Sequence, residues 1–98
     1  MNRAGGPAGA VRRTVTIRNR RGLHARAAAR FAKRAEAFDA QVRVSFRGQT
    51  VSALSIMGLM MLAAGPGSDV ELAAEGPQAA AALAALASLV DNRFEEDS

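Results

Sequence analysis

The sequence predicts an α+β fold in which three helices cover one face of a small, four-stranded sheet. Short stretches that alternate apolar and polar side chains are typical of half-buried strands. Longer stretches in which apolar side chains recur every three or four residues are typical of amphipathic helices. These stretches follow one another in the order β-α-β-β-α-β-α. The predicted architecture is an open-faced two-layer sandwich, with the second face of the sheet exposed to water.

The first half of the chain supplies two strands and one helix. We expect the first strand at residues 11–17, followed by a turn at residues 19–22. A helix is expected at residues 25–37, because its apolar and basic side chains fall on different faces. The apolar face contains Ala28, Phe31, Ala32 and Ala35, and the basic face contains Arg26, Arg30, Lys33 and Arg34. The second strand is expected at residues 41–46, where Val42, Val44 and Phe46 alternate with polar residues.

The second half supplies two strands and two helices. Arg47-Gly48 predicts a hairpin turn into a short strand at residues 49–51. Ser55 is of a type that caps helix N-termini, and a short helix is expected at residues 56–63, stopped by Gly65-Pro66-Gly67. A fourth strand follows at residues 69–75, with Val70, Leu72 and Ala74 on its apolar side.

The last helix is expected to open at Gly76-Pro77, with the proline in its first turn. Its apolar positions recur at three- and four-residue spacing as Leu83, Leu86, Val90 and Phe94. Residues 1–10 are rich in Gly, Ala and Pro and predict a disordered tail, so we assign residues 11–98 to the folded domain.

Composition excludes several classes of function. The chain of 98 residues has no cysteine and one histidine, so we expect neither a disulfide frame nor a metal site, and no cofactor. The N-terminus has no apolar core of a signal peptide, and the apolar run at residues 79–90 is shorter than the ~20 residues that span a bilayer. We therefore expect a cytoplasmic protein that does not interact with membranes and is a monomer.

Charge is distributed unevenly along the chain. Residues 1–49 contain twelve basic and two acidic residues, whereas residues 50–98 contain one basic and seven acidic residues. A basic half attracts an acidic or phosphorylated partner, or nucleic acid. An ordinary solvated surface explains the same pattern.

His24 is the strongest candidate for chemistry. It lies in Gly22-Leu23-His24-Ala25-Arg26, where a strand gives way to a helix, and this position suggests an imidazole presented to solvent. The start of a helix offers unpaired N–H groups to phosphate oxygens, and an arginine adds a bidentate partner. Histidine changes charge near neutral pH, so a neutral, nucleophilic ring is available in cells. The pattern indicates a site that carries a phosphoryl group, although a helix cap alone also explains it.

Two motifs resemble those of the HPr-type phosphocarrier proteins of the phosphoenolpyruvate-dependent phosphotransferase system. They are Gly22-Leu23-His24-Ala25-Arg26 and Ser55-Ile56-Met57-Gly58. The resemblance covers residues 13–94 and implies the same element order, with an antiparallel sheet. It departs from the family at Ala27, because many members have a proline there. Proline would rigidify the first turn of the helix, so its absence loosens this turn slightly.

The resemblance implies roles for particular residues. His24 would accept a phosphoryl group on Nδ1 from enzyme I, which takes it from phosphoenolpyruvate, and would pass it to an enzyme IIA-type acceptor. Arg26 would neutralise the phosphoryl oxygens, while the small Ala25 and Ala27 would leave the ring accessible. Helix propensity explains these two alanines equally well. The chain would then be a phosphocarrier rather than an enzyme that turns over a small molecule.

A second set of residues corresponds to regulation and docking in the family. Ser55 matches a serine that HPr kinase/phosphorylase modifies, and a helix cap is its simpler role. Ile56, Met57 and Met60 correspond to the apolar surface that binds enzyme I and IIA proteins, and Arg30 is added to this partner-binding set. Core packing is the simpler role for such residues: we expect Leu59 and Leu62 to face the core, and the same packing would explain some of the methionines.

The branch of the family is harder to assign. Gly76-Pro77-Gln78 and the ending Phe94-Glu95-Glu96-Asp97 look like the nitrogen-related paralogue, NPr. The motif at Ser55 looks more like serine-regulated HPr. We favour a regulatory system over sugar import.

The main alternative outside phosphotransfer is a basic module that binds RNA or protein through Arg26, Arg30, Lys33 and Arg34. Against RNA, the chain has four phenylalanines and no Trp or Tyr, and no strand carries an aromatic pair for base stacking. We therefore expect no nucleic-acid partner. A hydrolase is disfavoured because no serine or carboxylate lies near His24 in the sequence to complete a triad.

Overall fold

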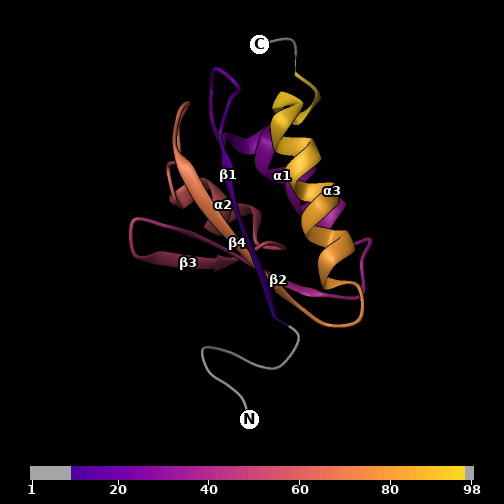
Figure 1. Ribbon diagram of the computed structural model, residues 1–98. Helices are drawn as coiled ribbons and strands as arrows, with labels where there is room; N and C mark the ends of the chain where they lie inside the picture. Colours follow the sequence, from indigo (N-terminus) through magenta and orange to yellow (C-terminus); the bar gives the residue numbers. More distant parts are fainter. Residues whose placement is uncertain (1–9, 97–98) are drawn as a thin grey trace.

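The computed structural model describes residues 10–96, so residues 1–9 of the expected tail and residues 97–98 of the expected domain lie outside the described residues. Four strands form one antiparallel sheet in the order β1-β4-β2-β3 (Figure 1). They are β1 (Val11–Thr16), β2 (Gln41–Phe46), β3 (Gln49–Ser52) and β4 (Asp69–Glu75). One face is covered by the helices α1 (Ala25–Ala35), α2 (Ile56–Met61) and α3 (Ala79–Asp91). The predicted fold class and element order are confirmed.

The two faces of the sheet differ as the alternating pattern predicts. Side chains that face the helices are buried, among them Val15, Val42, Val44, Val70, Leu72 and Ala74. The opposite face is polar and is crossed by ion pairs, Arg12 with Glu71 and Arg43 with Glu75, each with an N–O distance of 3.2 Å. The core therefore lies in one layer between sheet and helices, and the other face of the sheet meets water.

Several element boundaries differ from the prediction by one or two residues. β1 ends at Thr16, α1 at Ala35 and α2 at Met61. Ile17 still bonds across to the loop before β4, through Ser68 O and Gly67 N at 2.8 Å each. The hairpin at Arg47-Gly48 is confirmed, and both residues have positive φ, as a two-residue turn between twisted strands requires.

The last helix was predicted wrongly at both ends. It begins at Ala79 with Gln78 as N-cap, so Pro77 precedes the helix instead of occupying its first turn. Gln78 is held by Asp39, whose N–H donates to Oε1 of Gln78 at 2.7 Å. The helix ends at Asp91, and Phe94 lies beyond it in a short turn, η1 (Arg93–Glu95). Phe94 is nevertheless fully buried, which explains why its spacing looked helical.

The turn after α3 is left-handed. Arg93, Phe94 and Glu95 have φ values of 56°, 54° and 65°, a region that L-residues seldom enter one after another. The turn lies beside α1, where Arg30 and Arg34 bind it. Burial of Phe94 provides a compensating gain, since a buried phenylalanine contributes about 1.5–3 kcal/mol relative to an exposed one.

Candidate functional site

His24 is placed by the loop that joins β1 to α1. Gly22 has φ +65°, and the next residue, Leu23, donates its N–H to the carbonyl of Ala64 at 3.1 Å. A Cβ on Gly22 would lie 2.4 Å from that same carbonyl oxygen, so only glycine fits the close approach. His24 then takes an extended conformation as the N-cap of α1, and no side chain caps this end of the helix. The predicted position of His24 at a helix start is confirmed.

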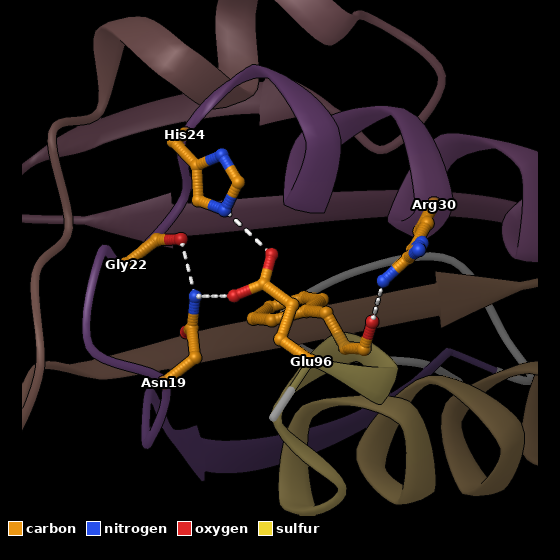
Figure 2. A network of polar contacts seen from close by, with 6 residues as sticks. Asn19, Gly22, His24, Arg30 and Glu96 are labelled. Carbon is orange, nitrogen blue, oxygen red and sulfur yellow. Dashed lines mark hydrogen bonds and ion pairs between the residues drawn. The ribbon is translucent and has the colours of Figure 1, made fainter. Parts of the chain in front are cut away.

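The side chain of His24 is not open to solvent, contrary to the prediction. It is 13% exposed, because the C-terminal segment lies against it. Its Nε2 atom lies 2.5 Å from Oε2 of Glu96 (Figure 2). The second ring nitrogen, Nδ1, lies on the side of the ring turned away from Glu96 (Figure 2). One ring nitrogen therefore contacts a carboxylate of the same chain, and the other faces away from that contact.

Asn19 joins the loop to the same carboxylate. Its Nδ2 atom donates to the carbonyl of Gly22 at 2.8 Å and to Oε1 of Glu96 at 3.1 Å. Asn19 is fully buried, and its Oδ1 atom has no hydrogen-bond partner among the described residues. A buried polar atom without a partner lowers stability, and the two hydrogen bonds donated by Nδ2 offset this cost.

The pKa of Glu96 is lowered below its ordinary value. Burial by itself would raise this pKa, but the hydrogen bonds from Asn19 and His24 and the electrostatic interactions with His24 and Arg30 outweigh it. Glu96 is therefore a carboxylate at neutral pH and accepts hydrogen bonds through both oxygens.

The C-terminal turn that carries Glu96 is tied to α1. Arg30 donates through a guanidinium nitrogen to the carbonyl of Phe94 at 2.6 Å, and Arg34 pairs with Glu95 at 3.5 Å. Two arginines of the predicted basic stripe therefore bind the chain's own C-terminal segment. The stripe is shorter than predicted, since Arg26 and Lys33 are exposed whereas Arg30 and Arg34 are half-buried.

The two alanines beside His24 and Arg26 lie in different surroundings. Ala25 is exposed, but Ala27 is fully buried and belongs to the core. The family resemblance implied that Ala27 leaves the ring open to solvent, but its burial in the core rules out this role. Arg26 forms no ion pair with the residues the structure describes, so its guanidinium group is free to bind an anion.

Ser55 and the residues after it form a second feature. Ser55 is the N-cap of α2, and its Oγ accepts a hydrogen bond from Gly58 N at 2.9 Å. Leu59 and Leu62 are buried as predicted. The large apolar side chains that stay exposed, here called the α2 patch, are Leu54, Ile56, Met57, Met60 and Met61, with Met57 67% exposed. Ile56, Met57 and Met60 belong to this patch, and Leu54 and Met61 extend it.

Sequence reasoning missed Asn19 and Glu96 as site residues. Glu96 is 72 positions from His24, so no local spacing links the two. No carboxylate lies near His24 in the sequence, but the fold brings one to it from the C-terminal segment. The signal in the sequence was the apolar Phe94, because an apolar residue near the end of the chain indicates that the C-terminal segment packs onto the domain.

Two further observations concern residues 10–96. No helix in this range has both the length and the apolar character needed to cross a membrane. In the same range, no three metal-ligating side chains are grouped so as to hold an ion.

Comparison with known proteins identifies the family. Residues 11–92 match the family model described as the PTS HPr component phosphorylation site. A phosphocarrier protein HPr from Cupriavidus necator is 50% identical over 86 residues, which cover 88% of this chain and 97% of that protein. A phosphocarrier protein NPr from Shewanella violacea is 44% identical over 88 residues, which cover 90% of this chain and 97% of that protein.

A crystal structure of HPr-C-His from Thermoanaerobacter tengcongensis has the same fold. The match has a TM-score of 0.85 at 40% identity and covers 90% of this chain and 99% of that one. Sequence, family model and fold agree over nearly the whole described range. This chain belongs to the HPr/NPr family of phosphocarrier proteins of the phosphotransferase system.

Proposed function

We propose that this chain carries a phosphoryl group on Nδ1 of His24, accepting it from phospho-enzyme I and passing it to an enzyme IIA-type acceptor. The observation that carries the proposal is the arrangement of the His24 ring. The ring sits at the N-cap of α1, its Nε2 atom is engaged by Glu96, and its Nδ1 atom is turned away from that contact. A nitrogen with a free lone pair at a helix N-terminus is suited to attack phosphorus.

The surroundings of His24 favour the phosphorylated state. The first turn of α1 has no side-chain cap, so its N–H groups can donate to phosphoryl oxygens. The guanidinium of Arg26, two residues after His24, supplies a positive charge and a forked donor. The helix dipole adds a favourable field for negative charge. In this proposal, Arg26 is the phosphoryl-stabilising residue.

The α2 patch is the proposed docking surface for both partners. It follows the hairpin of β2 and β3, and the chain after α2 contacts the His24 loop through Ala64 and Leu23. Methionine side chains are flexible and polarisable, so a surface rich in them adapts to more than one partner. Ile56, Met57 and Met60 form its predicted part. Arg30 was also assigned to partner binding, but its bond to Phe94 supports an internal role.

Ser55 is the proposed regulatory site. Its hydroxyl is exposed at the start of α2 and caps that helix. A phosphate there would suit the helix N-terminus while placing negative charge beside the α2 patch, which would weaken docking. Incubation with HPr kinase/phosphorylase and ATP tests this: wild type should be labelled and Ser55→Ala should not. We favour a regulatory, nitrogen-related system, acting in the cytoplasm as a monomer, with residues 11–98 as its single domain.

The first experiment tests phosphorylation by phosphoenolpyruvate and enzyme I of the same organism, with wild type beside His24→Ala. An acid-labile, alkali-stable label on wild type alone supports the carrier role. A second step adds a purified IIA protein and follows loss of the label. If active enzyme I leaves wild type unlabelled, the proposal fails, and the alternative of a basic binding module takes its place. Salt-dependent RNA binding would support that alternative.

A further inference from the structure

The contact between Glu96 and His24 joins two largely buried groups. Their side chains are 13% and 12% exposed, and the distance from Nε2 to Oε2 is 2.5 Å. A hydrogen bond at this length, with a charged acceptor, belongs to the stronger class. The other carboxylate oxygen is held by Asn19, so the carboxylate has little freedom to rotate (Figure 2).

The segment that carries Glu96 is fixed at three further points. Phe94 is fully buried, its carbonyl accepts from Arg30, and Glu95 pairs with Arg34. The three residues before Glu96 all adopt left-handed conformations, each of which costs about 1–2 kcal/mol for an L-residue. Simple packing of the chain end against the domain would not require three consecutive left-handed residues. The path brings one carboxylate to one ring nitrogen.

A fixed carboxylate on one nitrogen decides which nitrogen carries the proton. In a neutral imidazole, one nitrogen bears hydrogen and the other a lone pair, and the hydrogen bond made by one sets the state of the other. The carboxylate is an acceptor only, because the pKa of Glu96 is lowered and the group is ionised at neutral pH. Nε2 must therefore be the donor, which leaves the lone pair on Nδ1.

We propose that Glu96 is a positioning residue for phosphoryl transfer at His24: it keeps the proton on Nε2, holds the ring in one orientation and so presents the Nδ1 lone pair. This inference rests on the proposed function. During transfer, the bond from phosphorus to the donor breaks as the bond from phosphorus to Nδ1 forms, and the Nε2 proton stays on the ring. The positive charge that develops on the ring then faces the carboxylate, as in catalytic sites where an acid orients a histidine.

Nuclear magnetic resonance tests the proposal without any phosphotransfer. His24 is the only histidine, so ¹⁵N-histidine labelling reports on this ring alone. Two-bond ¹H–¹⁵N spectra at a pH where the ring is neutral distinguish the two tautomers. We expect the Nε2–H form in wild type and a mixture in Glu96→Ala. Glu96→Gln keeps an oxygen acceptor and should restore the Nε2–H form. The matched control is Glu71→Ala, which removes the same charge from the opposite, polar face of the sheet and should leave the tautomer unchanged.

The rate of phosphorylation by enzyme I is the second readout. Loss of a group that orients a metal-binding histidine typically lowers activity about 10- to 100-fold, and we expect a similar range for Glu96→Ala at this reacting histidine. Glu71→Ala should stay within about two-fold of wild type, because its carboxylate pairs with Arg12 on the opposite face of the sheet. Circular dichroism verifies that each variant is folded at the assay temperature.

The two proposals fail in different ways. If wild type is labelled and Glu96→Ala retains both the Nε2–H tautomer and the wild-type rate, the role of Glu96 is refuted while His24 remains the carrier. A glutamine variant with mixed tautomers would also count against a hydrogen-bonding role. If wild type is not labelled at all, the carrier function itself fails, whatever the tautomer spectra show.

Discussion

Gly22 lies where the His24 loop packs against the chain just after α2. Replacing it by alanine should destabilise the fold. At φ +65°, an alanine is strained by about 1–2 kcal/mol, and the stiffer unfolded chain offsets about 0.4–1 kcal/mol of that. The new Cβ would also lie 2.4 Å from Ala64 O and 2.8 Å from the Cα of Gly65. Both are backbone atoms, so the loop must move. Overpacking of this kind costs about 1–3 kcal/mol, which brings the expected total to about 1–5 kcal/mol.

Gly48 provides a matched control for this prediction. It also has positive φ, +81°, but nothing lies within 4 Å of the place where its Cβ would be. Gly48→Ala should therefore show the strain alone, a loss of about 1 kcal/mol. Urea unfolding is followed by far-UV circular dichroism, because the chain has no Trp or Tyr for fluorescence. If the two variants lose stability equally within about 0.5 kcal/mol, the close approach to Ala64 does not constrain the loop and the reasoning is refuted.

Three other changes test separate parts of the structure. Ala63 has φ +57° just after α2, so Ala63→Gly should raise the unfolding free energy by about 0.5–1 kcal/mol. As a control, Ala84→Gly within α3 should lower the unfolding free energy by about 1 kcal/mol. Urea unfolding measures both variants, and a loss of stability in Ala63→Gly would contradict the left-handed conformation of Ala63. Phe94→Ala should cost about 3–5 kcal/mol in the same assay, because its ring is fully buried; a loss below about 1 kcal/mol would mean that the C-terminal turn is not anchored. Because the pKa of Glu96 is lowered in the folded state, its ionised carboxylate stabilises the fold at pH values above its ordinary pKa of 4.5. This contribution disappears as the pH falls through the lower folded-state pKa, so the stability advantage of wild type over Glu96→Gln should shrink below about pH 4.5. A stability advantage that stays constant from pH 6 to pH 3 would contradict the ionised contact.

The sheet and most helices could be predicted from the sequence because their patterns are local. β4 was predicted at its observed bounds, since Val70, Leu72 and Ala74 alternate over a stretch closed by glycine on both sides. The end of α3 could not be predicted in this way. Phe94 continues the three- and four-residue spacing of the helix, and only the left-handed turn shows that it reaches the core by another route.

The candidate site was predictable only on the side of the loop and α1. The strand-to-helix boundary and the type of residue at position 24 indicated a phosphoryl site from local sequence alone. The carboxylate that binds His24 comes from the other end of the chain. That end contains three consecutive acidic residues, Glu95, Glu96 and Asp97, which the local sequence does not distinguish. Tertiary packing of Phe94 selects Glu96 among them. The same packing turns Arg30 and Arg34 inward, which no helical pattern could distinguish from an exposed basic stripe.

In this proposal, chemistry and recognition are assigned to different groups of residues. The orientation of the His24 ring depends on Asn19 and Glu96, which are internal to the fold and should be indifferent to the partner that is bound. Docking depends on the α2 patch, a separate set of exposed apolar side chains. A carrier that exchanges one phosphoryl group with two partners needs this separation, because the ring must react with the same nitrogen in both complexes while the surface adapts to each. Substitutions in the α2 patch should therefore change partner affinity and leave the tautomer of His24 unaltered, whereas Glu96→Ala should change the tautomer and leave affinity for an unphosphorylated partner unaltered.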